Sequence, residues 1–403
     1  MITLAALLLI IHFVAPLGYY LYLRNFYRRS DLVKDKTHRP SVTVVIPTYN
    51  ESNLVTRRLD NVASQDYPRE SFNILLVDSG STDDTVEIAK QWIAGRGAAN
   101  LRIVEEPYRK GKSQALNYAV GLIYTDIVVF TDADCSWEPH ALSKAMAYFS
   151  DSRVGAITGI KEPLSSSAHT FDQAYRDIYN KVRILESNRS STPIFNGEFA
   201  GFRRELLQEA GLFPATVGAD DSYMATFLAL KGFRSVAVPD VRIFELIPST
   251  YSDFMSWRVR RAKHLIQHFA KSIRMVQEAP GGFRLVLISE AFLHLPNPWL
   301  LFGGAALLLA GTVFDPRSFY FPIFLVTTVG LLLIPKMTRQ PLVVWVVSQA
   351  ILCYAALTGI KSKELIWQKP RKFVSGETSQ PKSVNDHTSA SKEPQDSNRR
   401  GAS

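Results

Sequence analysis

The sequence contains little cysteine and no recognisable nucleic-acid-binding pattern. Its 403 residues include two cysteines, Cys135 and Cys353, which are too few for a disulfide framework and favour the reducing face of a membrane. There is no Cys/His spacing typical of zinc sites, no RNA-binding signature and no internal repeat. The formal net charge of +9, with 46% hydrophobic residues, therefore indicates membrane segments flanked by basic residues rather than a nucleic-acid partner.

The first apolar run, residues 2–23, has no basic residues before it. About 20 such residues can cross a bilayer as a helix. A cleaved signal peptide would carry basic residues ahead of its apolar core, whereas Arg24, Arg28 and Arg29 follow this one. The positive-inside rule then predicts a retained membrane anchor, with the following domain in the cytoplasm.

Apolar runs near the end of the chain predict three further membrane spans, at residues 298–314, 319–334 and 342–360. A shorter run at 285–295 either lies at the interface or lengthens the first of these spans. Its Glu290 and His294, four residues apart, either line a path for a lipid acceptor or sit at the interface.

Basic residues around these spans give conflicting indications for the tail. The basic loop 336–340 is predicted to be cytoplasmic. Three spans would then place the tail outside, yet the lysines and arginines after residue 360 favour the inside, and the sequence leaves the side open. From residue 375 onward the chain is polar, which predicts disorder.

Between residues 42 and 130, short apolar strands alternate with helical stretches. Strands are predicted at 42–46, 73–77, 101–104 and 127–130, and helices at 54–64 and 113–123. This alternation predicts an α/β domain with a mostly parallel sheet covered on both faces. Ligands bind such sheets outside the carboxyl ends of the strands. Three polar loops, 47–51, 78–81 and 132–134, should converge there.

Two carboxylates, Asp132 and Asp134, alternate after the strand at 127–130 and fall on one side of the chain. Such a pair suits an octahedral Mg²⁺ or Mn²⁺, which takes one or two protein carboxylates and fills its shell from substrate phosphates. Taken alone, the pair is more often a solvated loop, so the neighbouring motifs decide the interpretation.

Two further clusters have a structural and a functional interpretation. Ser81, with Asp84 three residues later, has the pattern of a helix cap, which leaves Asp78 unexplained. The sequence Lys110-Gly111-Lys112 is either a solvated turn or a pair of point charges that counter a diphosphate.

Together, four segments resemble the successive donor-site motifs of the family 2 glycosyltransferases in order and spacing. These segments are residues 46–51, 78–85, 110–117 and 132–134. The resemblance covers residues 42–245, about half of the chain. It implies a GT-A fold, which is a Rossmann-like α/β domain, and an inverting transferase that uses a nucleotide-diphosphate sugar, with UDP-sugars favoured, and Mg²⁺ or Mn²⁺.

The resemblance also implies roles for individual residues on the donor side. Lys112 would lie near the nucleotide, Asp132 would meet the ribose or diphosphate, and Asp134 would ligate the metal with Asp132 beside it. The residues implied to hold the nucleobase and ribose are Pro47, Thr48, Tyr49, Glu51 and Asp78.

On the acceptor side, the stretch around Gly197 is similar to a glycine-containing segment of the family, or is a plain strand and turn before a helix at 205–210. The resemblance further implies that Asp221 is the general base, with Asp220 at the position of the usual glutamate. A sugar hydroxyl needs a positioned carboxylate to accept its proton during attack. The alternative is that the two aspartates cap a helix at 222–230.

Residues 253–269 predict a basic amphipathic helix at the headgroup boundary. Many membrane-bound relatives carry Gln-x-x-Arg-Trp here, and in this chain only Arg260 fits that pattern. We expect Arg260 to stabilise the departing diphosphate. The missing glutamine and tryptophan weaken the case for processive synthesis. Arg258 and Arg261 either serve the site or face anionic lipid.

The predicted function is transfer of a sugar to a lipid-linked or glycan acceptor by a multi-pass enzyme of the cell membrane. The alternatives are a processive polysaccharide synthase of the chitin, hyaluronan or poly-N-acetylglucosamine type, and a catalytically inactive scaffold. The predicted parts are an anchor at 1–23, a GT-A catalytic domain at 40–248, a basic interfacial region at 249–282, about three transmembrane helices at 283–362 and a disordered tail at 363–403.

Overall fold

The computed structural model describes most of the chain before residue 315 and one helix after it. The predicted span at 319–334, the loop at 336–340, Lys110 and the tail lie outside the described residues. The described ranges are 1–25, 31–98, 100–108, 111–163, 170–214, 217–248, 250–314 and 341–359.

The first half of the sheet is parallel and has its four strands in the order β3-β2-β1-β4. This confirms the four predicted strands, of which the first three extend a little further because the ladder continues, for example in the Thr48–Asp78 pair. The strands are β1 (Val42–Thr48), β2 (Phe72–Asp78), β3 (Leu101–Glu105) and β4 (Ile127–Phe130).

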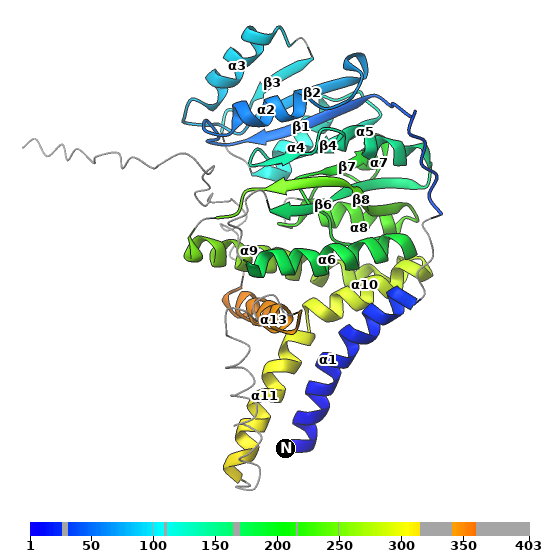
Figure 1. Cartoon of the computed structure of the whole chain (residues 1–403), viewed down its shortest axis with the longest axis vertical. Helices are drawn as coiled ribbons and strands as arrows, with labels where there is room; N and C mark the ends of the chain where they lie inside the picture. The colour runs from blue at the N-terminus through cyan, green and yellow to red at the C-terminus, as the bar shows by residue number, and fades with distance from the viewer. Residues whose placement is uncertain are drawn as a thin grey trace, which may run out of the picture.

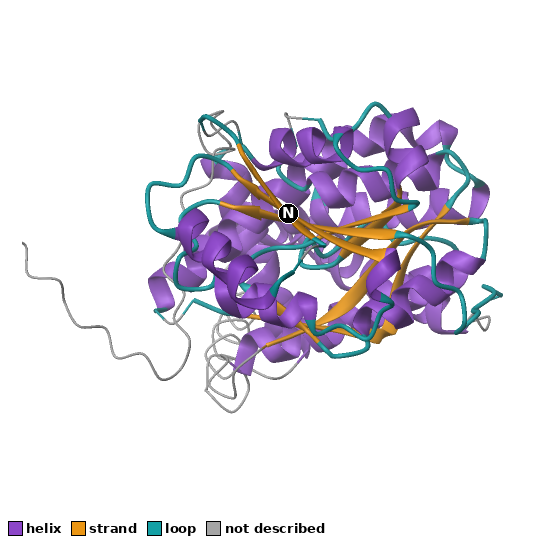
Figure 2. Cartoon of the chain, turned by 90° about the horizontal axis from the view of Figure 1, so that it is seen from above, coloured by secondary structure: helices purple, strands orange, loops and turns teal. Residues whose placement is uncertain are grey.

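Helices cover both faces of this sheet, as Figure 2 shows from above. Alternate side chains of β1 enter different cores, because successive residues of a strand point to opposite faces. Val44 packs in the core with α2 (Val55–Ala63) and α3 (Thr85–Arg96), whereas Val45 packs in the core with α4 (Lys112–Gly121). The two-sided cover predicted from the sequence is therefore confirmed.

The second half of the sheet is mixed, so the expectation of a mostly parallel sheet holds only for the first half. The order continues as β4-β7-β6-β8-β5, with β7 antiparallel to both of its neighbours and β6 parallel to β8. The strands are β5 (Cys135–Trp137), β6 (Val154–Pro163), β7 (Ala200–Arg203) and β8 (Arg234–Glu245).

Short helices flank this half of the sheet. They are α5 (Ala141–Met146), α7 (Arg204–Glu209) and α8 (Asp220–Leu230). Two long helices, α6 (Thr170–Arg189) and α9 (Tyr251–Ser272), lie between the sheet and the apolar helices below it (Figure 1). The predicted basic amphipathic helix is α9, and the Thr250 hydroxyl caps it by accepting a bond from the Asp253 amide (3.1 Å). The helix α6 was not predicted.

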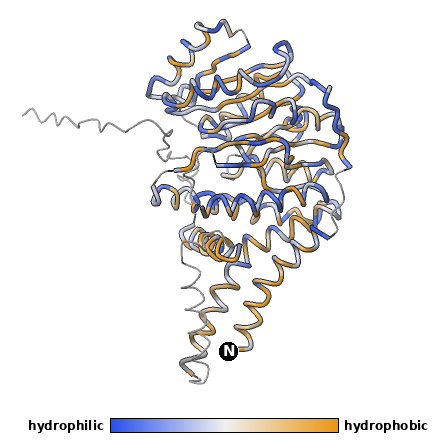
Figure 3. Tube along the Cα trace, viewed as in Figure 1, coloured by the Kyte–Doolittle hydropathy of each residue, from blue (hydrophilic) through white to orange (hydrophobic). Residues whose placement is uncertain are grey.

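Three apolar helical stretches of the described chain are long enough to cross a membrane: Ile2–Asn25, Gly281–Gly311 and Pro341–Thr358. The first is α1, the second combines α10 (Gly281–His294) with most of α11 (Asn297–Phe314), and the third is α13. Figure 3 shows the hydrophobic colouring of α1 and α11, and many large apolar side chains of α1 are exposed, as lipid contact requires. In Figure 1, α13 lies beneath α9 and α6, at the upper end of α11.

The helices α1 and α11 approach closely. A Cβ at Gly304 would lie 2.8 Å from a side-chain atom of Leu9, so glycine is required for this approach. A polar cluster joins the same helices to α13. The His12 Nδ1 lies 3.0 Å from the carbonyl oxygen of Asn297, and the Trp345 indole donates to His12 Nε2 (3.0 Å).

We predict opposite effects for two glycine-to-alanine substitutions. A Cβ at Gly159 would lie 2.6 Å from the Val241 carbonyl oxygen, so Gly159→Ala should force β6 and β8 apart and cost about 1–3 kcal/mol. Gly95, inside α3, has open space around it, so Gly95→Ala should stabilise by about 0.5–1 kcal/mol. Denaturant unfolding in detergent measures both changes, and equal effects would contradict the packing argument.

Candidate active site

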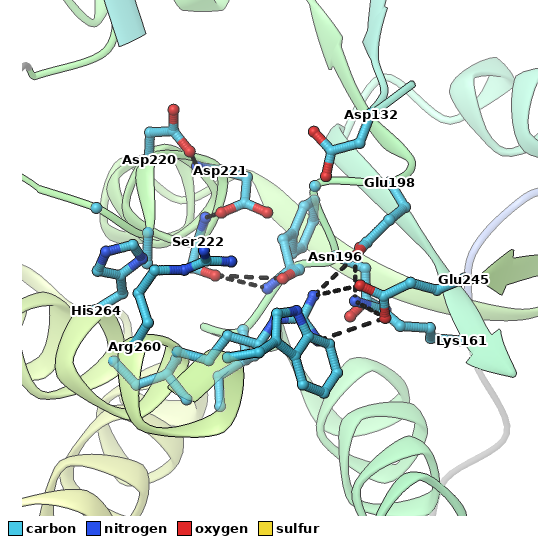
Figure 4. Close-up of a pocket in the computed structure, with 18 of the residues that line it drawn as sticks. Asp132, Lys161, Asn196, Glu198, Asp220, Asp221, Ser222, Glu245, Arg260 and His264 are labelled. Carbon is cyan, nitrogen blue, oxygen red and sulfur yellow. Dashed lines mark hydrogen bonds and ion pairs between the residues drawn. The ribbon is translucent and has the colours of Figure 1, made fainter. Parts of the chain in front are cut away.

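One cavity of about 330 Å³ lies where the carboxyl ends of β1 and β4 meet the start of α8. Its other walls come from α6 and α9 (Figure 4). The three polar loops expected to converge each contribute to it. The predicted site residues that line the cavity are Pro47, Thr48, Tyr49, Glu51, Lys112, Asp132, Asp134, Gly197, Asp220, Asp221 and Arg260.

Asp78 is the predicted site residue that does not line this cavity. It is buried, and its Oδ1 accepts hydrogen bonds from the hydroxyls of Thr48 (3.0 Å) and Ser81 (2.5 Å). Its Oδ2 accepts from the Ser81 amide (2.8 Å). The carboxylate therefore fixes the loops after β1 and β2 to each other from behind the cavity wall.

The prediction that Ser81 caps a helix is wrong. The helix α3 begins at Thr85, where Asp83 accepts a bond from the Thr85 amide (3.1 Å). The Ser81 hydroxyl instead donates to Asp78 and accepts from the Asn50 amide (2.8 Å). The Ser81 hydroxyl therefore joins the loops after β1 and β2, and the helix begins four residues later.

The acidic pair occupies the loop after β4. Asp134 is 7% exposed, and Asp132 accepts an ion-paired hydrogen bond from Lys112 Nζ (2.8 Å). Arg58 supports this loop from inside, because its Nη2 donates to the Thr131 hydroxyl (2.6 Å). Burial lowers the pKa of the Arg58 guanidinium, and the carboxylates of Asp132 and Asp134 counter that effect.

The donor set of the acidic pair fits Mg²⁺ or Mn²⁺ held jointly with a phosphorylated ligand. Among the described residues there is no group of three or more His, Cys, Asp and Glu side chains that could hold a metal by themselves. Asp132 and Asp134 offer hard carboxylate oxygens, which these ions prefer. A ligand with phosphate oxygens would complete the shell.

The second acidic pair lies at the start of α8 and faces Gly197. A Cβ at Gly197 would lie 3.0 Å from Asp221 Oδ2 and 3.2 Å from Lys112 Nζ, so glycine leaves room for both groups. Asp221 Oδ1 accepts from the Ser222 amide (2.8 Å), which leaves Oδ2 directed toward Gly197. Ala219, not either aspartate, occupies the cap position of α8, so the capping interpretation is wrong.

The charges around Asp221 make it a weak acid. Burial, followed by the Asp220 carboxylate, raises the pKa of Asp221 to about 7, while Lys112 acts in the opposite direction. Burial alone would lower the pKa of Lys112, but the carboxylates of Asp132, Asp220 and Asp221 raise it well above its ordinary value. Asp221 can therefore exchange a proton near neutral pH, as a general base must.

A buried ion network forms the opposite wall of the cavity. Glu198 Oε1 accepts from Lys161 Nζ (2.5 Å) and from Arg261 Nη2 (2.8 Å). Glu245 pairs with Lys161 (3.3 Å), Arg261 (3.2 Å) and Arg176 (3.0 Å). Figure 4 shows Lys161, Glu198 and Glu245 grouped on one side of the cavity, apart from Asp220 and Asp221. The network joins the sheet to α6 and α9.

The hypothesis that Arg258 and Arg261 face anionic lipid is wrong. Arg258 is buried, lies 3.5 Å from Asp172 and stacks 3.7 Å from the ring centroid of Tyr175. Arg261 contacts the two network glutamates and lies 4.3 Å from the Trp257 ring centroid. Both face the protein interior because buried carboxylates stand opposite them.

Arg260 extends from α9 into the cavity (Figure 4). Burial, followed by the neighbouring Arg261, lowers its pKa to about 10, and the carboxylates of Asp134 and Asp132 partly offset this. Its charge is therefore positioned near the acidic pair of the donor side.

Several cavity residues were not anticipated from the sequence, among them Lys161, Asp172, Arg176 and Glu245. The available signal was the Asp172–Arg176 pair, spaced i, i+4 on one helical face. Glu290 and His294, which the sequence suggested for a lipid path, are both buried, and His294 also lines the cavity.

Comparison with known proteins identifies relatives of this chain. The family model described as Glycosyl transferase family 2 matches residues 43–211. A solved structure, the mannosyltransferase PcManGT from Pyrobaculum calidifontis in complex with GDP-Man and Mn²⁺, is 40% identical. The match covers 89% of this chain and 98% of that one, with a TM-score of 0.79.

Two curated relatives match over shorter stretches. Glycosyltransferase AglE of Haloferax volcanii is 30% identical over 177 residues, which cover 43% of this chain and 56% of that protein. The poly-beta-1,6-N-acetyl-D-glucosamine synthase of Staphylococcus epidermidis is 24% identical over 259 residues, covering 63% and 62%. The chain thus spans less than two thirds of these relatives.

We predict that Glu198→Gln destabilises the protein by about 3 kcal/mol or more, because the buried Lys161 and the partly exposed Arg261 both lose a buried counter-charge. The matched control is Glu105→Gln, whose carboxylate pairs with Lys90 at the surface (2.9 Å). There the loss should stay below about 1 kcal/mol. Denaturant unfolding followed by tryptophan fluorescence compares them, and a loss for Glu198→Gln no larger than that of the control would contradict a stabilising network.

Proposed function

Because the chain belongs to glycosyltransferase family 2, we propose that it transfers a sugar from a nucleotide-diphosphate donor, with inversion, to a membrane-associated acceptor. The observation that carries this proposal is the composition of one cavity. It is lined by the acidic pair Asp132 and Asp134, by Asp221, and by Ile351 and Leu352 of the apolar helix α13.

GDP-mannose is our first candidate donor, because the solved relative with 40% identity is a mannosyltransferase in complex with GDP-Man. UDP-sugars, which the sequence favoured, are the second candidates. The loop 47–51 would hold the nucleoside, with Asp78 fixing the shape of that loop through Thr48 and Ser81. Lys112 would pair with the diphosphate in exchange for its present partner Asp132.

Asp134 and Asp132 would hold Mg²⁺ or Mn²⁺, and Mn²⁺ accompanies the donor in that relative. Bound there, the ion would supply positive charge to the diphosphate as negative charge develops on it. Arg260, positioned near the same carboxylates, would add a fixed positive charge on the protein side.

Asp221 would act as the general base in a single in-line displacement. The acceptor hydroxyl oxygen forms a bond to the anomeric carbon while the bond from that carbon to the diphosphate oxygen breaks. The hydroxyl proton passes to the Asp221 carboxylate, and the nucleoside diphosphate leaves. Gly197 leaves the space in which this carboxylate meets the acceptor.

We place the acceptor in the membrane because the cavity is bounded by α13 as well as by the catalytic loops. The catalytic domain would be cytoplasmic, in keeping with Arg24 at the end of α1. A silent scaffold is disfavoured, because it would need none of the carboxylates that share this cavity.

The experiment is nucleoside diphosphate release by the detergent-purified full chain with Mn²⁺, across GDP- and UDP-sugars, with and without membrane lipid extract. We expect nucleoside diphosphate to be released from one of the donors, and the amount released to rise when the lipid extract is added. Asp221→Asn should abolish release and keep donor binding by calorimetry. Asp177→Asn, at an exposed carboxylate of α6, should behave as wild type.

Two results would change the proposal. Full transfer by Asp221→Asn would remove Asp221 as the base. Nucleotide binding without release from any donor, in the presence of extract, would favour the scaffold.

A pH profile tests the environment of the base. Because the pKa of Asp221 is raised to about 7, kcat/KM should rise about tenfold per pH unit below neutrality and level off above it. Lys112→Met should move this acid limb to higher pH, since Lys112 lowers the pKa of Asp221. An acid limb at the ordinary pKa of an aspartate, or an unmoved limb in the variant, would assign the base elsewhere.

A further inference from the structure

The guanidinium of Arg183, on α6, lines the cavity with unused hydrogen-bonding capacity. Within the described chain it makes one hydrogen bond, from Nη1 to Asn196 Oδ1 (2.8 Å). Its Nε is inaccessible to solvent and has no hydrogen-bond partner there. A guanidinium has five N–H donors, and Arg183 uses one of them on Asn196, so terminal donors of a side chain that lines the cavity remain for a ligand.

Arg183 differs from the other cations of the same wall. Lys161, Arg176, Arg258 and Arg261 all pair with Asp172, Glu198 or Glu245, which gives four cations against three carboxylates. In the described part of the chain Arg183 has no carboxylate within 4 Å. This wall of the cavity therefore carries an excess of positive charge, which favours an anionic ligand.

Two carboxyl groups, of Glu186 and Glu290, attract Arg183 electrostatically but have other hydrogen-bond partners. Glu186 accepts hydrogen bonds from the hydroxyls of Tyr19 (2.6 Å) and Thr192 (2.7 Å), and it is hydrogen-bonded to Glu290. Burial raises the pKa of Glu186, which favours a shared proton between the two carboxyl groups. They attract Arg183, but in the described chain its guanidinium donates its hydrogen bond to Asn196 and not to either of them.

The hydrogen-bond partner of Arg183 is Asn196, the residue before Gly197. Asn196, which receives its hydrogen bond, is itself fixed by Thr158 (3.1 Å) and by the Gly159 carbonyl oxygen (2.8 Å). The next residue is Gly197, which abuts Asp221. Figure 4 shows Asn196 between Asp221 and Glu245 in this view.

The same cavity continues to the apolar helices. Ser348, Ile351 and Leu352 of α13 line it, together with His294 of α10 and Leu265 of α9. A ligand that reaches Asp221 from this side would present an apolar chain to α13 and a polar group to α6.

We propose that Arg183 binds a phosphate group of the acceptor, at the junction between its lipid chain and the hydroxyl that Asp221 deprotonates. The acceptor is then a glycan carried on a lipid phosphate, and the reacting hydroxyl belongs to its sugar. This inference rests on the proposed function and names the chemical class of its acceptor. A guanidinium suits this role because its planar donors match phosphate oxygens.

The binding test uses the full chain in a neutral detergent, with decyl phosphate, decanol and inorganic phosphate as probes. Wild type should be stabilised against heat by decyl phosphate and much less by decanol or inorganic phosphate. Arg183→Met should lose that stabilisation, whereas the control Lys181→Met, an exposed cation of the same helix, should keep it. Equal stabilisation by inorganic phosphate would overturn the lipid-phosphate assignment, and unchanged stabilisation of Arg183→Met would overturn the role of Arg183.

The kinetic test measures transfer to membrane lipid extract fractionated into phosphate-bearing and neutral lipids. Arg183→Met should raise the KM for the phosphate-bearing acceptor roughly 10- to 100-fold, with the KM for the donor unchanged. Arg183→Lys should recover part of the loss. An increased donor KM in Arg183→Met would instead assign Arg183 to the donor diphosphate.

The two proposals fail differently. If wild type releases nucleoside diphosphate from none of the donors tested, the proposed function fails. If transfer proceeds but prefers neutral acceptors, or if Arg183→Met has the acceptor KM of wild type, only the phosphate site fails.

Discussion

The ion network around Glu198 and Glu245 is the constraint on which the arrangement of this protein depends. Charges removed from water are costly unless they are paired, so Arg176 of α6 and Arg261 of α9 must remain opposite Glu245 of β8. The two helices that carry these cations also contact the apolar helix α13. The network therefore fixes the position of the sheet relative to the apolar helix α13.

The site divides according to the elements that build it. The half that we propose for the donor consists of loops at the ends of parallel strands, where Asp78 and Arg58 act from behind to fix the loops that face the cavity. The half that we propose for the acceptor consists of helix faces, on which aromatic and basic side chains of α6 and α9 meet apolar residues of α13. Gly197 lies at the boundary, beside both Lys112 and Asp221.

The sequence predicted the donor half better than the acceptor half for a physical reason. Strands such as 127–130 are short apolar runs, and the polar residues that follow them must lie at one edge of the sheet, so local pattern is sufficient. Ser81 was misassigned because its partner Asp78 precedes it and competes with the cap. The partners of Arg258 and Arg261 are distant in sequence, and which carboxylate a buried arginine meets cannot be read from spacing.

The polar contact inside the membrane helices has a consequence for biogenesis. His12 emerges from the ribosome about 285 residues before Asn297 and 333 residues before Trp345, which it contacts in the finished protein. Until those residues arrive, an imidazole within the anchor must remain hydrated or be held by another component of the insertion machinery. Once α13 is complete, its Trp345 indole satisfies His12 of α1. A chain truncated before α13 therefore leaves His12 without this hydrogen bond.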